Sequence, residues 1–250
     1  MSAIAAVFYR EGKLRVTNLT YIFWDLLYPL GYLLVFGVGV NAALGTPFSA
    51  GAVDYNSFFL AGVLGMASFG VASNTAWGIF MDRDNGIFFE MLTYPMSRAA
   101  FIGAKVMFNV GVVVVQALVT VVAAWLLLGV QIRFALLPVL LVGVVVGTSG
   151  WFFFYAIFAL RIRRNDLFNT VTSIFYFVFL FASSMFYPIE PLPGWFRTAA
   201  ILNPITWHVD VLRYATIGLG DPGKIALEGA AFLIFTAASF GLAVKNLARE

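Results

Sequence analysis

The sequence contains one pair of residues that could act as a serine nucleophile and its base. Gly147-Thr148-Ser149-Gly150 is a G-x-S-G motif, and His208 is the one histidine of the chain. A Ser–His dyad can cleave an amide bond when the imidazole accepts the hydroxyl proton across a hydrogen bond. Gly143, Gly147 and Gly150 also have the small-residue spacing that lets helices pack closely, which favours a structural role for this stretch and for His208.

Other motifs for catalysis or cofactor binding are incomplete. The chain has no Cys and one His, so it lacks the usual ligand sets of zinc and of iron–sulfur clusters. Gly37-Val38-Gly39-Val40-Asn41-Ala42 fits a dinucleotide-binding pattern, but it lies in an apolar run without a βαβ unit. Gly218 to Lys224 spells most of a Walker A loop, yet Ile225 replaces the magnesium-binding Ser or Thr. We predict no catalytic residue, metal site or cofactor in this chain.

The composition indicates that membrane-spanning helices position any functional residue of this chain. Of 250 residues, 62% are hydrophobic and 11% are charged, whereas about 25% of a soluble domain is charged. Six apolar windows reach or nearly reach the roughly 20 residues that cross a bilayer. The windows are 26–53, 55–81, 106–131, 134–160, 167–189 and 229–244, the last extended by 225–227 with Glu228 snorkelling to the surface. We therefore predict an all-α membrane protein with six transmembrane helices, a single domain over 1–250.

The charges between these windows predict the orientation of the chain. Eleven Lys and Arg lie on the side that carries both termini, and four lie on the other side. By the positive-inside rule, both termini are cytoplasmic and the protein spans the plasma (inner) membrane several times. The scattered cations predict no nucleic-acid partner. Because the six windows are uncharged, a self-driven pump is disfavoured, and any transport is expected to draw its energy from a partner.

Segment 1–20 predicts a helix at the cytoplasmic membrane surface. Ile4, Val7, Phe8 and Leu14 fall near one helical face, and Arg10 lies off it. An untidy start to the first span is the alternative. A signal peptide is disfavoured because charges interrupt the apolar run that it needs.

The cytoplasmic segment 82–105 predicts a short helix with an exposed apolar face. The turn signal Asn85-Gly86 precedes Ile87, Phe88, Met91 and Leu92, which recur at helical spacing with Glu90 beside them. Tyr94-Pro95 ends the helix. An apolar face on a charged loop indicates a partner surface, with binding to the lipid surface as the alternative.

The external segment 187–224 is too apolar for a solvated loop. Pro193 can open a short helix that ends before Asn203-Pro204, and a second helix follows in which Asp210 and Arg213 can pair at i,i+3. Neither helix is long enough to span the bilayer. We predict two re-entrant helices that dip into the outer leaflet and return.

At these residues the sequence resembles the permease subunits of type-2 ABC exporters, which include O-antigen, teichoic-acid, capsule, nodulation-factor and daunorubicin-type permeases. The resemblance covers almost the whole chain. It rests on Phe186 to Pro193, Leu202-Asn203-Pro204-Ile205-Thr206, Asp210-Val211-Leu212-Arg213, Glu90-Met91-Leu92, Pro95-Met96-Ser97-Arg98 and Gly103-Ala104-Lys105.

The resemblance implies a half-transporter rather than an enzyme. Two permease copies, as a homodimer in the bilayer, would join two copies of a separate ATPase subunit that binds ATP and Mg²⁺. The amphipathic substrate would be a lipid, lipid-linked glycan or drug. By resemblance, the ATPase-coupling residues are Gly86, Ile87, Phe88, Glu90, Met91, Leu92, Pro95 and Arg98, and the external re-entrant gate contains Tyr187, Pro188, Pro193, Asn203, Pro204, Asp210 and Arg213.

Two alternatives have other residue requirements. A rhomboid-like intramembrane serine protease would use Ser149 and His208, although rhomboids carry their histidine inside the sixth span, which His208 precedes. A non-transporting membrane scaffold would need neither the dyad nor the coupling helix.

Overall fold

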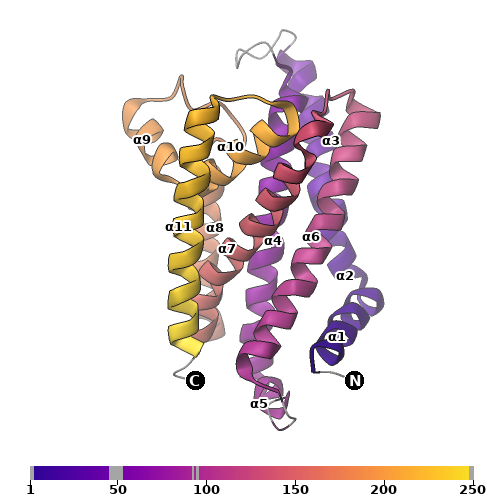
Figure 1. Cartoon of the computed structure of the whole chain (residues 1–250), viewed down its shortest axis with the longest axis vertical. Helices are drawn as coiled ribbons and strands as arrows, with labels where there is room; N and C mark the ends of the chain where they lie inside the picture. Colours follow the sequence, from indigo (N-terminus) through magenta and orange to yellow (C-terminus); the bar gives the residue numbers. More distant parts are fainter. Residues whose placement is uncertain (1–2, 45–52, 92, 94–95, 248–250) are drawn as a thin grey trace.

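The computed structural model describes residues 3–44, 53–91, 93 and 96–247. Long helices run side by side along one axis, and short helices lie at both ends (Figure 1). Every regular element of the described part of the chain is a helix, which confirms the all-α prediction.

Five helical stretches are long and apolar enough to cross a membrane. The first combines α2 (Leu19–Ile22), a π-helical turn η1 (Phe23–Leu27) and most of α3 (Tyr28–Leu44). The fourth joins a 3-10 turn η2 (Phe134–Leu136) to α7. Helix α7 spans Leu137–Arg161. The other three stretches are single helices: α4 (Tyr55–Asp84), α6 (Arg98–Leu128) and α11 (Pro222–Leu247).

The fifth predicted span, 167–189, is shorter than expected. Helix α8 (Asn165–Phe181) has 17 residues, about 25 Å at 1.5 Å per residue, and it ends well inside the window 167–189. The reason is tertiary: the Asn203 amide nitrogen donates to the carbonyl oxygens of Phe179 at 2.9 Å and Ala182 at 2.6 Å. Ser183 Oγ also donates to the Leu180 carbonyl. These bonds satisfy carbonyls that a continuing helix would use, so the chain can turn within an apolar run.

Helix α4 forms the centre of the bundle and is buried along most of its length. It packs against α3, α6, α7 and α10 (Pro204–Ile217). Small residues make this possible, since a Cβ on Gly65 would lie 2.6 Å from Cγ2 of Val209, and a Cβ on Gly62 would overlap the Met185 carbonyl. The external segment therefore packs directly onto the central helix.

Asp25 and Glu228, which border apolar windows, are buried carboxylates within candidate spans. Asp25 lies in the first span because the helix begins before the apolar window, and its carboxylate is 2.8 Å from Arg15 Nη1. Glu228 of α11 does not snorkel: it is buried, with Oε1 3.4 Å from Lys224 Nζ. In both cases a basic partner compensates the carboxylate, which makes its burial tolerable.

The two ends of the molecule carry different short helices. Helix α1 (Ala3–Thr17), helix α5 (Ile87–Met91) and both ends of the chain lie at one end, and α9 (Gly194–Leu202) and α10 lie at the other (Figure 1). The termini thus share one side, as the charge distribution predicts. The short helices also occur in the three segments where they were expected.

Candidate functional site

The predicted coupling segment forms a tight turn followed by one helical turn. Gly86 adopts φ 77°, a left-handed conformation that favours glycine, and its carbonyl accepts the backbone N–H groups of Phe89 and Glu90. Helix α5 then projects beyond the end of α4 (Figure 1). Arg98 starts α6, whose first turn is capped by Ser97. Leu92 and Pro95 lie outside the described residues.

The side chains of α5 divide into an inward and an outward set. Phe88 is buried, and its ring lies 5.6 Å from that of Phe101 in an edge-to-face contact. Phe89 is 50% exposed, Glu90 is exposed, and Ile87 and Met91 are half-buried. Phe88 therefore anchors α5 to its own bundle, and Phe89, which the sequence analysis did not select, is the large apolar side chain that faces outward.

An ion-pair cluster lies beside α5 and connects three helices. The Asp82 carboxylate, at the end of α4, accepts from Arg10 Nη2 of α1 at 2.6 Å and from Lys105 Nζ of α6 at 2.5 Å. Glu11 Oε1 lies 3.2 Å from the same lysine. Asp82, Lys105 and Glu11 are all buried. This cluster fastens α1 to the two helices that flank the coupling segment.

The cluster places Arg10 of α1 against the bundle. Its guanidinium turns inward to Asp82, and Ile4 and Leu14 are exposed. Burial lowers the pKa of Arg10, but the hydrogen bond to Asp82 and its charge outweigh burial, so that the pKa lies above its usual value. The guanidinium is thus charged at neutral pH.

At the opposite end, Asn203 organises the external segment. Its side-chain oxygen accepts the Ile205 backbone N–H at 3.1 Å and caps α10, and Pro204 occupies the first turn. Because its nitrogen also holds the end of α8, one side chain fixes two helices. Pro193 precedes α9, and the hydroxyl of Tyr187 donates to the Phe181 carbonyl.

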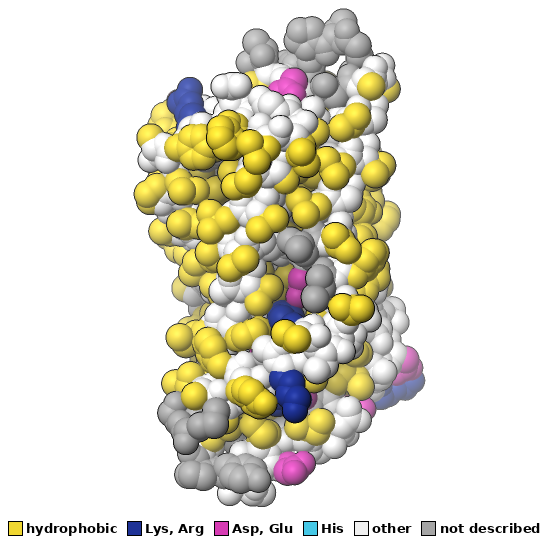
Figure 2. Space-filling view, turned by 90° about the vertical axis from the view of Figure 1, so that its right-hand side faces the viewer, with side chains coloured by type: hydrophobic (Ala, Val, Ile, Leu, Met, Phe, Trp, Pro, Cys, Tyr) yellow, Lys and Arg dark blue, Asp and Glu magenta, His cyan; other side chains and the backbone are white. Residues whose placement is uncertain are grey.

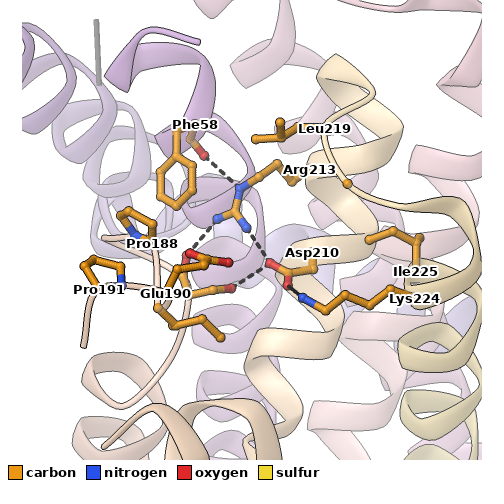
Figure 3. Close-up of a pocket in the computed structure, with 12 residues that line it drawn as sticks. Phe58, Pro188, Glu190, Pro191, Asp210, Arg213, Leu219, Lys224 and Ile225 are labelled. Carbon is orange, nitrogen blue, oxygen red and sulfur yellow. Dashed lines mark hydrogen bonds and ion pairs between the residues drawn. The ribbon is translucent and has the colours of Figure 1, made fainter. Parts of the chain in front are cut away.

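Arg213 is the most completely bound charged side chain of this segment. Its guanidinium pairs with Asp210, donates to the carbonyl of Ser184 at 2.7 Å and lies over the ring of Phe58 at 3.9 Å (Figure 3). Ser184 Oγ donates to Asp210 at 2.7 Å. The predicted i,i+3 pair is therefore present and joins α10 to α4 and to the segment after α8.

These residues border a cavity of about 640 Å³ at this end of the molecule. Pro188, Glu190 and Pro191 line one side, and Lys224 and Ile225 of α11 line the other (Figure 3). Lys224 Nζ lies 3.6 Å from Asp210. The stretch from Gly218 to Lys224 thus connects α10 to α11 and supplies one wall of the cavity.

The two cations of this cavity should contribute very differently to stability. Arg213→Met leaves Asp210 buried without its main partner, so we expect a loss of about 3–5 kcal/mol. Lys224 is half-exposed, so Lys224→Met should cost less, about 1–2 kcal/mol, even though buried Glu228 also loses its basic partner. Thermal unfolding of the purified variants measures both values, and equal losses would contradict this ranking.

The structure does not assemble the Ser149–His208 dyad. The Ser149 hydroxyl donates to the Val145 carbonyl at 2.7 Å on its own helix. His208 Nδ1 accepts from Trp151 Nε1 at 3.3 Å, and Nε2 lies 3.2 Å from the Gly143 carbonyl. One ring nitrogen accepts and the other donates, so both are used by structural contacts. His208 is a buried packing residue, with its ring stacked on Phe232.

The glycines near His208 provide a sharp stability test. A Cβ on Gly147 would overlap the imidazole, so Gly147→Ala should cost about 1–3 kcal/mol through overpacking. Gly241→Ala is the control, since a Cβ there meets nothing within 4 Å. The comparison requires only thermal unfolding midpoints. Equal midpoints for the two variants would show that His208 does not pack tightly here.

A second hollow of about 360 Å³ lies among the first span, α4 and α8. Its lining combines aromatic rings with hydroxyl and amide groups, a composition that suits an amphipathic molecule. The lining residues include Trp24, Tyr28, Ser73, Asn74, Ser173 and Tyr176. Of the neighbouring aromatic residues of α8, Tyr176 lies here, Phe175 and Phe179 pack on Phe154, and Phe177 is 63% exposed.

Known proteins match most of this chain. It is 28% identical over 211 residues to the daunorubicin resistance ABC transporter permease protein DrrB1 of Streptomyces coeruleorubidus, covering 82% of this chain and 72% of that protein. It is 23% identical over 199 residues to the putative transport permease ycf38 of Cyanophora paradoxa. That match covers 76% of this chain and 65% of the relative, so the chain spans slightly less than two thirds of its length.

A family model described as ABC-2 type transporter matches residues 2–217, which include the first four apolar spans, α5, α8 and both external helices. The arrangement of apolar helices around these segments agrees with a multi-pass membrane protein. The chain therefore belongs to the ABC-2 type transporter family, among its membrane permeases.

Proposed function

We propose that this chain is the transmembrane half of an ATP-driven exporter, acting as a homodimer with two copies of a separate ATPase subunit. The observation that carries the proposal is helix α5. It projects from the end of the bundle, is anchored by buried Phe88 and presents Phe89 and Glu90 outward. The family match supports the transport role of the chain.

The neighbouring ion pairs give α5 a mechanical connection to the spans. Movement of α5 would pull on α4 directly, and the bonds of Asp82 to Arg10 and Lys105 would carry the displacement to α1 and α6. Buried charge pairs resist separation, because parting them leaves uncompensated charges. ATP binding and hydrolysis in the partner would thus be converted into helix movement.

The hollow among the first span, α4 and α8 is the proposed half of the translocation pathway. Helix α3 exposes Val35 and Val38, and α8 exposes Ile174 and Phe177. A second copy that covers such apolar faces would enclose the hollow between two permeases. Its mixed lining supports an amphipathic substrate, in the class of lipids, lipid-linked glycans or drugs. The external gate of α9 and α10 would then close the outer end.

Glu90→Lys tests the proposed partnership. The tagged chain is purified from its host in mild detergent, and the masses of the intact complexes are measured. We expect two permeases with two ATPase subunits, and at least about a tenfold loss of bound ATPase in Glu90→Lys, from reversal of a charge at the interface. Asp84→Lys also replaces a carboxylate by an ammonium, at the nearby end of α4, and this variant should retain the ATPase. A wild-type chain without any ATPase would contradict the proposal.

A further inference from the structure

A groove between α1 and α6 has the features of a lipid site. It has a volume of about 550 Å³, and its walls are mainly apolar, with Phe8 of α1 facing Met107, Phe108, Val112 and Val115 of α6. Figure 2, which views the side of the molecule that carries these helices, shows acidic and basic atoms recessed among hydrophobic side chains. The polar residues of the groove are Arg15, Asp25 and Gln116.

Gln116 has a buried side-chain amide that lacks hydrogen-bond partners in the part of the chain that the structure describes. It is 2% exposed and lies inside a predicted membrane span. Neither its side-chain oxygen nor its nitrogen has a hydrogen-bond partner among the described residues. Leaving a buried donor unpaired costs about 1–3 kcal/mol. A ligand in the groove that supplies an acceptor would remove that cost.

The neighbouring polar groups are already paired with each other. Asn109 donates to the Lys105 carbonyl at 2.7 Å and accepts from Arg15. Arg15 also pairs with Asp25 at 2.8 Å, although its Nε has no partner among the described residues. The groove therefore carries no net charge at this level, and the amide of Gln116 is its unpaired uncharged group. A ligand with a neutral acceptor, such as an ester carbonyl, fits this chemistry.

The position of Gln116 along α6 fits a lipid of the leaflet in which α1 lies. Gln116 is seven residues beyond Asn109, about 10 Å along the axis, and its side chain leans back toward the start of the helix. Along the axis of α6, the Gln116 amide thus lies a few ångströms farther from the α1 end of the bundle than Arg15 does. Next to Gln116, Val115 begins an exposed apolar stripe that continues through Val119, Val122 and Leu126 of the same helix. An acyl chain leaving the groove would continue along this stripe.

We propose that this groove binds one membrane glycerophospholipid. Its headgroup lies at the level of Arg15, an ester carbonyl accepts a hydrogen bond from the Gln116 amide, and an acyl chain follows the stripe. The proposal depends on α6 crossing the bilayer, not on the ATPase or on transport. It assigns a structural lipid to the cleft between the surface helix and the bundle, where that lipid would fasten α1.

Gly111 allows the groove to be filled without a clash in the protein. A Cβ on Gly111, which lines the groove, meets nothing within 4 Å, and the same is true of Gly103 on the same helix, which does not line it. Gly111→Leu should therefore occupy the lipid's space, and Gly103→Leu is the matched control. Gln116→Leu removes the hydrogen bond and leaves a similar volume.

The test uses the full chain in nanodiscs of phosphatidylethanolamine and phosphatidylglycerol, with trace phosphatidylglycerol that carries a diazirine on an acyl chain. Mass spectrometry of peptides maps the crosslinks after irradiation. In the wild type we expect labelling concentrated on 115–126, where the acyl chain lies. This labelling should fall about tenfold in Gly111→Leu and about fivefold in Gln116→Leu, the latter from one lost hydrogen bond. Gly103→Leu should label as the wild type does.

Two results would overturn the proposal. Equal labelling of 115–126 in all four proteins would identify annular lipid only. A photoreactive residue at position 111 that crosslinks a second copy of the chain, in place of the lipid, would assign the groove to a protein contact. Unfolding midpoints of the variants accompany the labelling, so that loss of the lipid is distinguished from loss of the fold.

Discussion

Asp82→Asn should lower the thermal unfolding midpoint of the permease by about 6–12 °C. The substitution removes the carboxylate shared by Arg10 and Lys105 and leaves Lys105, which is 4% exposed, with only Glu11 to balance it. Breaking a buried ion pair on one side typically costs about 3 kcal/mol or more, which corresponds to that shift for a chain of this size. Dye-based thermal unfolding in detergent measures it.

A second substitution separates charge from packing in this result. Asp82→Asn combined with Lys105→Met removes the uncompensated ammonium, so the double variant should recover at least half of the lost midpoint. Asp166→Asn is the surface control, because its pairing with Arg164 is largely exposed and should matter little. If Asp82→Asn and Asp166→Asn behave alike, the cluster does not hold the three helices together.

Phe89→Ala should reduce ATPase affinity and transport without affecting folding. The ring is half-exposed at the tip of the molecule, and a large aromatic side chain is a typical hot spot of an interface. Truncation of such an anchor costs about 2 kcal/mol, which is roughly thirtyfold in affinity. Titration of the purified ATPase against the reconstituted permease measures the loss.

The chain offers a closely matched control for this experiment. Phe134 is 53% exposed, similar to Phe89, but it lies at the external end in η2. Phe134→Ala removes the same atoms and should bind the ATPase as the wild type does. Equal binding by Phe89→Ala and Phe134→Ala would exclude α5 as the principal contact.

Local patterns in the sequence predict the short helices well. Asn85-Gly86 marks the turn before α5, and Gly86 has the positive φ that such a turn needs. Asn203-Pro204 marks the junction of α9 and α10, and the spacing of Asp210 and Arg213 predicts their pair. Each feature depends on residues a few positions apart, so the sequence alone contains the necessary information.

Features that depend on distant contacts were not predictable in the same way. Arg10 meets Asp82 across 72 positions, and Asn203 ends α8 by bonding to carbonyls more than 20 positions earlier. A five-residue helix also gives too few residues to define its buried face. Phe88 turns inward because Phe101 packs against it, which leaves Phe89 outside. The candidate coupling surface therefore required the structure.

The most direct test of the proposed mechanism is a photo-crosslink from α5 in the intact membrane. A photoreactive phenylalanine analogue replaces Phe89 in one strain and Phe134 in another, and both are irradiated in native membranes. We predict a crosslink from position 89 to a soluble ATPase, stronger when nucleotide is present, and none to that ATPase from position 134. An efficient crosslink from position 89 to lipid alone would contradict the assignment of α5 as the coupling helix.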